Sequence, residues 1–287
     1  MWATSLETIG LDTSNSKGTE IAGSGTANVK SSYTQLVAST GLTAVWIQLM
    51  VGHSTSANTA DFLYDIATGA AASETVVIAD VPFCTGGNTF YTRSTTLIPI
   101  AIASGTRIAS RVQLNGTATT LFFTISAILG AESDITSGAV TNYGSNTSDS
   151  GAVSVDPGGT ANTKGSYSQI AASTSAAHNW LNPVLGNQDN GVRTGANWLM
   201  DIATGAAASE VVVIPDVWIE MGSTLDVPFT YSWNFGVTEI ASSTRLAARM
   251  QCSITDATDR TFDLAIFGSN PTFSGGGGGG GEHSHVF

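Results

Sequence analysis

One segment of this chain is written twice. Asp65–Val81 reads DIATGAAASETVVIADV and Asp201–Val217 reads DIATGAAASEVVVIPDV, so 15 of 17 positions are identical at an offset of 136 residues. Two long copies this far apart do not form the short, many-fold pattern of a solenoid. The duplication therefore predicts two tandem globular domains that share one fold.

The match extends on both sides of this segment. Gly25–Thr40 aligns with Gly159–Thr174 at an offset of 134, and Ser104–Gln113 aligns with Ser242–Gln251 at an offset of 138. An offset that grows in steps indicates loops that lengthened between fixed strands. We expect one domain at 1–132, a linker at 133–140, a second domain at 141–268 and a glycine-rich tail at 269–287.

Within each repeat, apolar and polar residues alternate with the period of a β-strand. In Thr106–Gln113, for example, Ile108 and Val112 point away from the face that carries the arginines. Such segments, about eight per repeat, are separated by clusters of Gly, Ser, Thr and Asn, which favour turns. The sequence predicts an all-β protein of two tandem antiparallel β-sandwich domains, jelly-roll-like in topology, with Thr68–Ser73 as a loop.

The balance of charge excludes some partners. Ten basic residues stand against 22 acidic ones, which gives a net charge of −12. Such a chain repels the phosphate backbone, so we expect no nucleic-acid partner. Neither a run of 18 apolar residues nor a secretory leader is found, so we expect no membrane span and synthesis in a cytoplasm.

Several charged residues recur in both repeats. Paired carboxylates can act as the acid and base of a hydrolase. The alternative, which we favour, is that they cap turns and form ion pairs at strand ends, and that the protein is not an enzyme. The recurring residues singled out are Asp65, Asp201, Glu74, Glu210, Arg107, Arg245, Arg111 and Arg249. Asp80 and Asp216 recur as well, whereas Cys84 and Cys252 do not match and are expected to be buried.

Aromatic residues offer candidate binding positions. Trp46 and Trp180 recur, and we expect them to pack in the core. Three tryptophans, Trp198, Trp218 and Trp233, occur only in the second repeat. Exposed indole rings can stack on sugars, so these three mark a candidate surface for glycans.

The tail combines seven glycines, Gly275–Gly281, with His283 and His285. The glycines are expected to form a flexible tether. In an extended strand, residues two apart point the same way, so the two imidazoles would share a side. Three chains would then offer six nitrogens to an octahedral transition metal. A metal ion held by a trimer is thus the one cofactor considered, and none is otherwise required.

This HSH ending resembles the tips of tail fibres of tailed bacteriophages, where such a pattern holds iron between three chains. The segments GTANTKGSYSQIAAST, DIATGAAASEVVVIPDV and STRLAARMQ are similar to a repeated β-sandwich module of phage structural proteins. The resemblance implies a virion component in a tail fibre or baseplate appendage. Its expected partners are its own copies in a trimer, other virion proteins and host surface glycans. A capsid decoration (cement) protein and a soluble carbohydrate-binding module remain as alternatives.

Overall fold

The computed structural model describes residues 4–53, 60–85, 93–116, 122–132, 135–188, 196–221, 231–255 and 261–274. Strands and turns account for the regular structure in these ranges, which confirms the predicted all-β class. None of the described residues lies in a helix long and apolar enough to cross a membrane. Gly275–Gly281, His283 and His285 fall outside the described residues, so the tether and the metal site stay predictions.

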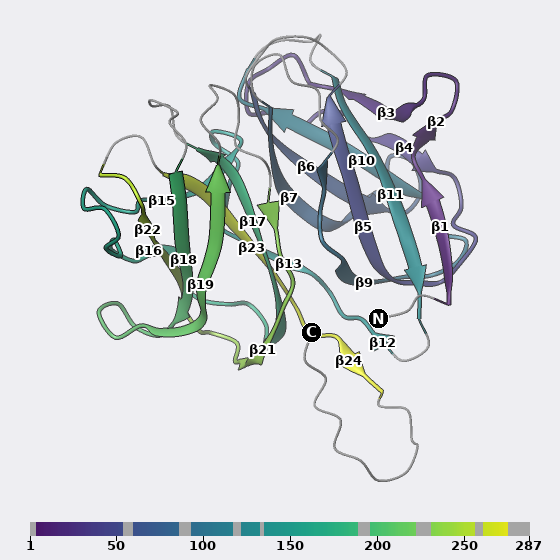
Figure 1. Cartoon of the computed structure of the whole chain (residues 1–287). Helices are drawn as coiled ribbons and strands as arrows, with labels where there is room; N and C mark the ends of the chain where they lie inside the picture. Colours follow the sequence, from purple (N-terminus) through teal and green to yellow (C-terminus); the bar gives the residue numbers. More distant parts are fainter. Residues whose placement is uncertain are drawn as a thin grey trace.

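The first domain is built from a large and a small antiparallel sheet (Figure 1). The large sheet contains β1 (Ser5–Ile9), β2 (Leu11–Asp12), β3 (Lys17–Ala22), β5 (Ala44–His53), β8 (Arg93–Ser94), β9 (Ile98–Ile102) and β11 (Phe122–Ala131). The small sheet contains β4 (Thr34–Val37), β6 (Ala60–Thr68), β7 (Thr75–Thr85) and β10 (Ile108–Leu114).

The second domain repeats this arrangement strand for strand. Its large sheet contains β13 (Thr141–Tyr143), β14 (Ser145–Asn146), β15 (Gly151–Val155), β17 (His178–Gln188), β20 (Tyr231–Ser232), β21 (Phe235–Ile240) and β23 (Phe262–Ser269). Its small sheet contains β16 (Ser168–Ala171), β18 (Ala196–Thr204), β19 (Val211–Met221) and β22 (Leu246–Cys252).

The strand order is that of a jelly roll. The principal strands of the first domain run β3-β11-β5-β9 in one sheet and β4-β10-β6-β7 in the other. The chain therefore crosses between the sheets at each step except the β6–β7 hairpin, which is the double Greek key of a jelly roll. The apolar side chains of the alternating strands fill the space between the two sheets. Ile108 and Val112 lie in this apolar core, on the side away from the arginines.

The duplicated segment forms the β6–β7 hairpin and its counterpart, β18–β19. In each, Ser donates to a backbone oxygen three residues earlier, Ser73 N to Ala70 O and Ser209 N to Ala206 O, both at 3.0 Å. The alanines of both turns are exposed. These small side chains therefore do not pack against their own sandwich, because the turn projects from the sheet.

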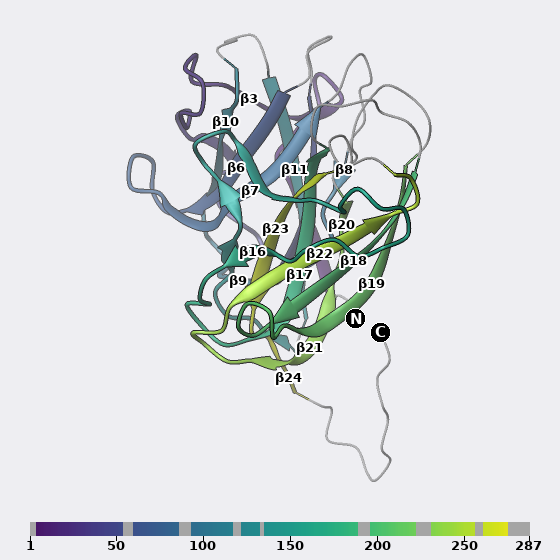
Figure 2. The same ribbon diagram turned by 90° about the vertical axis from the view of Figure 1, so that its left-hand side faces the viewer.

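The four sheets are stacked in layers. The large sheet of the second domain lies against the small sheet of the first, where β7 contacts β17, β13 and β14 (Figure 1). Val184 and Phe267 of the second domain join the apolar cluster of the first domain's core. The outer layers are thus the large sheet of the first domain and the small sheet of the second, which faces the viewer in Figure 2.

Hydrogen bonds fix this junction. Asn142 Nδ2 donates to Ala79 O at 2.7 Å and to Asp80 O at 3.0 Å, and Ser145 Oγ donates to Asp80 O at 2.7 Å. The buried side chain of Gln113 donates through Nε2 to Thr147 O at 2.9 Å. Because buried polar groups must find partners, these bonds specify one docking arrangement of the two domains.

A two-stranded ribbon joins the linker to the segment that follows the second domain. In it, β12 (Ile135–Thr136) pairs with β24 (Thr272–Phe273), so Ile135 lies opposite Phe273. The Phe273 ring lies 6.0 Å from that of Trp180. Residues 135–136 and 272–273 therefore meet beside Trp180 of the second domain.

Candidate functional site

The recurring acids and bases form the same network in each domain. In the first, Asp65 on β6 is almost fully buried. Its Oδ1 accepts hydrogen bonds from Lys30 Nζ at 2.8 Å and from the backbone nitrogen of Asp80 at 2.9 Å, and its Oδ2 accepts one from Arg111 Nε at 2.7 Å. In the second domain, Asp201 accepts the corresponding bonds from Lys164, Asp216 and Arg249 at 2.8, 3.0 and 2.9 Å.

A β-bulge aims the backbone at this carboxylate. The pairing of β6 with β7 changes register between Tyr64 and Ile66, and Asp80 on the facing strand has a φ of 54°. Asp216 has a φ of 49° at the matching bulge. A bulge turns a backbone group out of the ladder, which here lets the Asp80 nitrogen reach Asp65. The side chain of Asp80 also pairs with Lys30, at 2.6 Å.

A second pair braces the base of the repeated hairpin. Arg107 Nη1 lies 3.0 Å from Glu74 Oε1 and donates to Gly69 O at 3.1 Å. Arg245 makes the equivalent contacts, at 2.9 Å to Glu210 and 3.2 Å to Gly205 O. The structure thus pairs each singled-out acid with a singled-out base.

In each domain a tyrosine ring covers the arginine that binds the buried aspartate. The Arg111 guanidinium lies 4.6 Å from the centre of the Tyr33 ring, and Arg249 lies 4.6 Å from that of Tyr167. Burial raises the pKa of both tyrosines, which the nearby arginine partly opposes. Burial would also raise the pKa of Asp201, but its hydrogen bonds outweigh this and hold the pKa below its usual value.

Lys30 and Lys164 are the functional members of the network that the sequence reasoning missed. They recur in GTANVK and GTANTK at the same offset as the surrounding residues, so the alignment carried the signal. With them, six of the ten lysines and arginines in the chain belong to these duplicated networks. Their acids already bind several donors, and this arrangement fastens strands together rather than presenting an acid and a base to a substrate.

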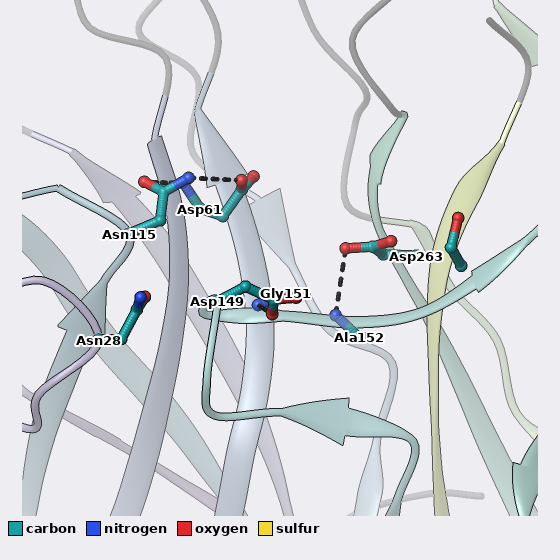
Figure 3. A pocket seen from close by; sticks show the side chains of 8 residues that line it. Asn28, Asp61, Asn115, Asp149, Gly151, Ala152 and Asp263 are labelled. Carbon is teal, nitrogen blue, oxygen red and sulfur yellow. Dashed lines mark hydrogen bonds between the residues drawn. The ribbon is translucent and has the colours of Figure 1, made fainter. Parts of the chain in front are cut away.

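A polar cleft of about 430 Å³ lies between the two domains (Figure 3). Its walls carry Asn28, Asp61, Asn115, Asp149, Gly151, Ala152, Ser154 and Asp263. Each carboxylate accepts a hydrogen bond from a neighbour: Asp61 from Asn115 Nδ2 at 2.8 Å, Asp149 from Gly151 N at 2.9 Å and Asp263 from Ala152 N at 3.1 Å.

The cleft fits a role in joining the domains. Asn28, on its rim, accepts a hydrogen bond from Ser150 Oγ of the other domain at 2.7 Å. Among the described residues, no group of three or more His, Cys, Asp or Glu side chains is arranged to hold a metal ion. The carboxylates of the cleft order turns at the junction.

The structure separates the three tryptophans of the candidate glycan surface. Trp198 on β18 is 1% exposed and packs edge-on against Phe262, with ring centres 5.0 Å apart, so its ring has no face for a ligand. Trp233 is half-buried against the core of the second domain. Trp218 on β19 is 63% exposed, and its Nε1 donates to Asn197 Oδ1 at 3.3 Å.

Other expected core residues are in place. Trp46 and Trp180 are both buried, as are Cys84 and Cys252. His178 is the first residue of β17 and is buried, with its Nε2 2.7 Å from the Tyr143 hydroxyl. Burial lowers the pKa of His178.

Comparison with known proteins assigns no family to the chain. No family model matches it, and no curated protein does. Among solved structures, a chain from naturally occurring empty particles of cowpea mosaic virus is similar at 10% identity and a TM-score of 0.30, over 88% of this chain and 92% of that one. A chain of infectious bursal disease virus, Gx strain, is similar at 12% identity and a TM-score of 0.26, over 84% and 59%. At these scores the similarities carry no argument about function.

Proposed function

We propose that the chain is a structural protein of a tailed-bacteriophage virion, built into a tail fibre or baseplate appendage. The observation that carries the proposal is the duplicated charge network. Residues that are identical in both repeats, such as Asp65 and Asp201, form ion pairs that hold strands together. The duplication therefore preserved the fold and the ion pairs that stabilise it. Jelly rolls serve in viral shells and in lectins, and the resemblance of the repeated module to phage structural proteins favours the virion.

Position on the particle is the test. Antibodies raised against the purified chain would be used for immunogold labelling of particles released by cells that carry the gene in its native genome. Label at the tail or baseplate is the expected result. Label spread over the head would favour the capsid decoration protein instead, and intact particles without label would overturn both.

A carbohydrate-binding module is the second candidate, and Trp218 is the observation in its favour. An exposed indole held by Asn197 offers a flat apolar surface of the kind that stacks on sugar rings. A glycan array probed with the wild-type chain and with Trp218→Ala tests it. Binding that this substitution abolishes would support a glycan receptor, and binding that it leaves intact would remove Trp218 from the candidate surface.

A further inference from the structure

The junction between the domains brings together two kinds of surface, and each domain carries both. The first domain contributes the outer side of its small sheet along β7, and the second contributes the outer side of its large sheet along β13, β14 and β17. Because the fold is duplicated, the second domain has its own small-sheet surface on β19. The first domain likewise has its own large-sheet surface on β1, β5 and β11.

The small-sheet surface is covered in one domain and open in the other. On β7, Pro82 and Cys84 are buried, and the Pro82 side chain lies 3.5 Å from where a Cβ on Gly186 of the second domain would be. At the matching positions of β19, Trp218 and Glu220 are exposed. The side chain of Asp80 is 24% exposed, and that of its counterpart Asp216 is 60% exposed.

The large-sheet surface shows the reverse difference. In the second domain Val184 and Phe267 are buried against the first domain. The registers of β5 with β11 and of β17 with β23 match these residues to Met50 and Ile128, which are only partly buried.

Two exposed leucines lie at this same open surface. Leu6 is 63% exposed and Leu11 is 53% exposed. Their counterparts both take part in the junction: Val140 packs on the core of the first domain, and Ser145 donates to Asp80 O. Leu6 and Leu11 thus leave apolar area open at the positions where the second domain makes its junction contacts.

We propose that the chain associates head to tail with a second copy of itself, using the same pair of surfaces that joins its own domains. The head face comprises Pro215, Asp216, Trp218 and Glu220 on β19. The base face comprises Leu6, Thr8, Leu11, Met50 and Ile128 on the first domain. Trp218 of one copy lies on the base face of the next, as Pro82 lies on β17 within the chain. This contact between copies does not depend on where on a particle the chain is located.

The contact is heterologous, since two different faces meet. After two copies pair, the pair therefore keeps one unused head face and one unused base face, and further copies add until a ring closes or a filament grows. This asymmetry gives the proposal a test that a symmetric dimer would not pass.

The test uses two full-length variants, each blocked on one face. Trp218→Asp places a charge on the head face, and the double variant Leu6→Asp with Leu11→Asp does so on the base face. All three side chains are exposed, so folding should be unaffected, which circular dichroism and thermal melting would check. Ala172→Asp, in the exposed turn after β16, adds one negative charge outside both faces and serves as the control for added charge.

Sedimentation velocity over a concentration series would measure the assemblies. The wild type and Ala172→Asp should assemble, and each face variant alone should be monomeric, its self-association weakened at least about tenfold because a central Trp usually dominates a contact. An equimolar mixture of the two face variants should form a one-to-one dimer and nothing larger, because each supplies the face that the other lacks.

Three results would overturn the proposal. The first is a wild-type chain that stays monomeric at its highest soluble concentration. The second is a mixture that stays monomeric although each variant blocks assembly, which would indicate a symmetric contact. The third is Trp218→Asp that assembles normally but loses binding on a glycan array, which would assign Trp218 to a glycan. None of these depends on where immunogold label falls, so the proposed location can fail independently.

Discussion

Pro82 of the first domain lies buried against the second domain, whereas Trp218, at the matching position of the second domain, stands in solvent. Asp65 and Asp201, in contrast, have the same partners at nearly the same distances. The two domains thus share their internal ion-pair networks and differ in their outer faces. Internal contacts depend only on the fold, which both domains share, while an outer face depends on what covers it.

The largest effect should come from breaking the shared network. Asp65→Ala and Asp201→Ala each leave a lysine and an arginine without their buried carboxylate, so each should lower the free energy of unfolding by about 3 kcal/mol. Urea unfolding of the full chain, with hydrogen exchange to locate the weakened domain, would measure this. Asp156→Ala, at an exposed turn, is the control and should cost under about 1 kcal/mol.

The two domains should respond alike to this change. If one aspartate proved dispensable while the other did not, the networks would differ in energy despite their equal geometry. A loss below about 1 kcal/mol in both would mean that the duplicated charges do not hold the strands.

Exchanging the residues at matching positions of the outer faces should change the free energy of unfolding much more in the first domain than in the second. Pro82→Trp forces an indole into the junction beside Gly186 and should cost about 1–3 kcal/mol by overpacking. Trp218→Pro should cost much less, because β19 is an edge strand and its counterpart β7 already accommodates proline there. Urea titrations of both variants would compare them, and equal losses would contradict the difference between the faces.

A smaller difference should appear on mild acidification. The pKa of His178 is lowered by burial, which a backbone contact with Ser269 partly opposes. As pH falls below the usual value of 6.5, the unfolded chain binds a proton that the folded chain does not, so stability falls until the folded pKa is passed. The first domain has Ala44 at the matching position and lacks this dependence.

The variant His178→Ala isolates this effect. Urea midpoints at about pH 7.5 and about pH 5.5 should draw together in the variant relative to the wild type. The variant also loses the contact with the Tyr143 hydroxyl at every pH, so the pH dependence is the diagnostic quantity. An unchanged dependence on pH would remove His178 as its source.

The smallest effect should come from the repeated turn. Ala71 is exposed, so Ala71→Trp should change the free energy of unfolding by no more than about 0.5 kcal/mol. Thermal melting would check the fold and sedimentation velocity the assembly. Loss of assembly with intact folding would mean that the turn contacts a neighbouring copy, and loss of folding would contradict its exposed position.

The fold was within reach of the sequence because its signals are local. Alternation such as that around Ile108 and Val112 defines strands, and the duplication defines two equal domains. The ion pairs were also accessible, since Asp65 and Arg111 recur together. Lys30 recurs too, but it lies between β3 and β4 and not on a strand, so alternation gave no direction for its side chain.

The outer faces could not be predicted from the sequence in the same way. Trp198 and Trp218 lie in alternating strands of one sheet, and the sequence does not say which side of each strand meets the core. Trp198 points inward and Trp218 outward, a difference that depends on the pairing of β18 with β19 across a bulge. The partner of Pro82 lies in another domain, and no local pattern reports it.

The ribbon of β12 and β24 has a mechanical consequence. Because β24 pairs with the linker, tension applied to the chain beyond Ser274 passes through that pairing to the first domain and bypasses the sheets of the second. The second domain would bear load only after the pairs Ile135–Phe273 and Thr136–Thr272 had separated. The ribbon is thus the first contact expected to break when the C-terminal segment is pulled.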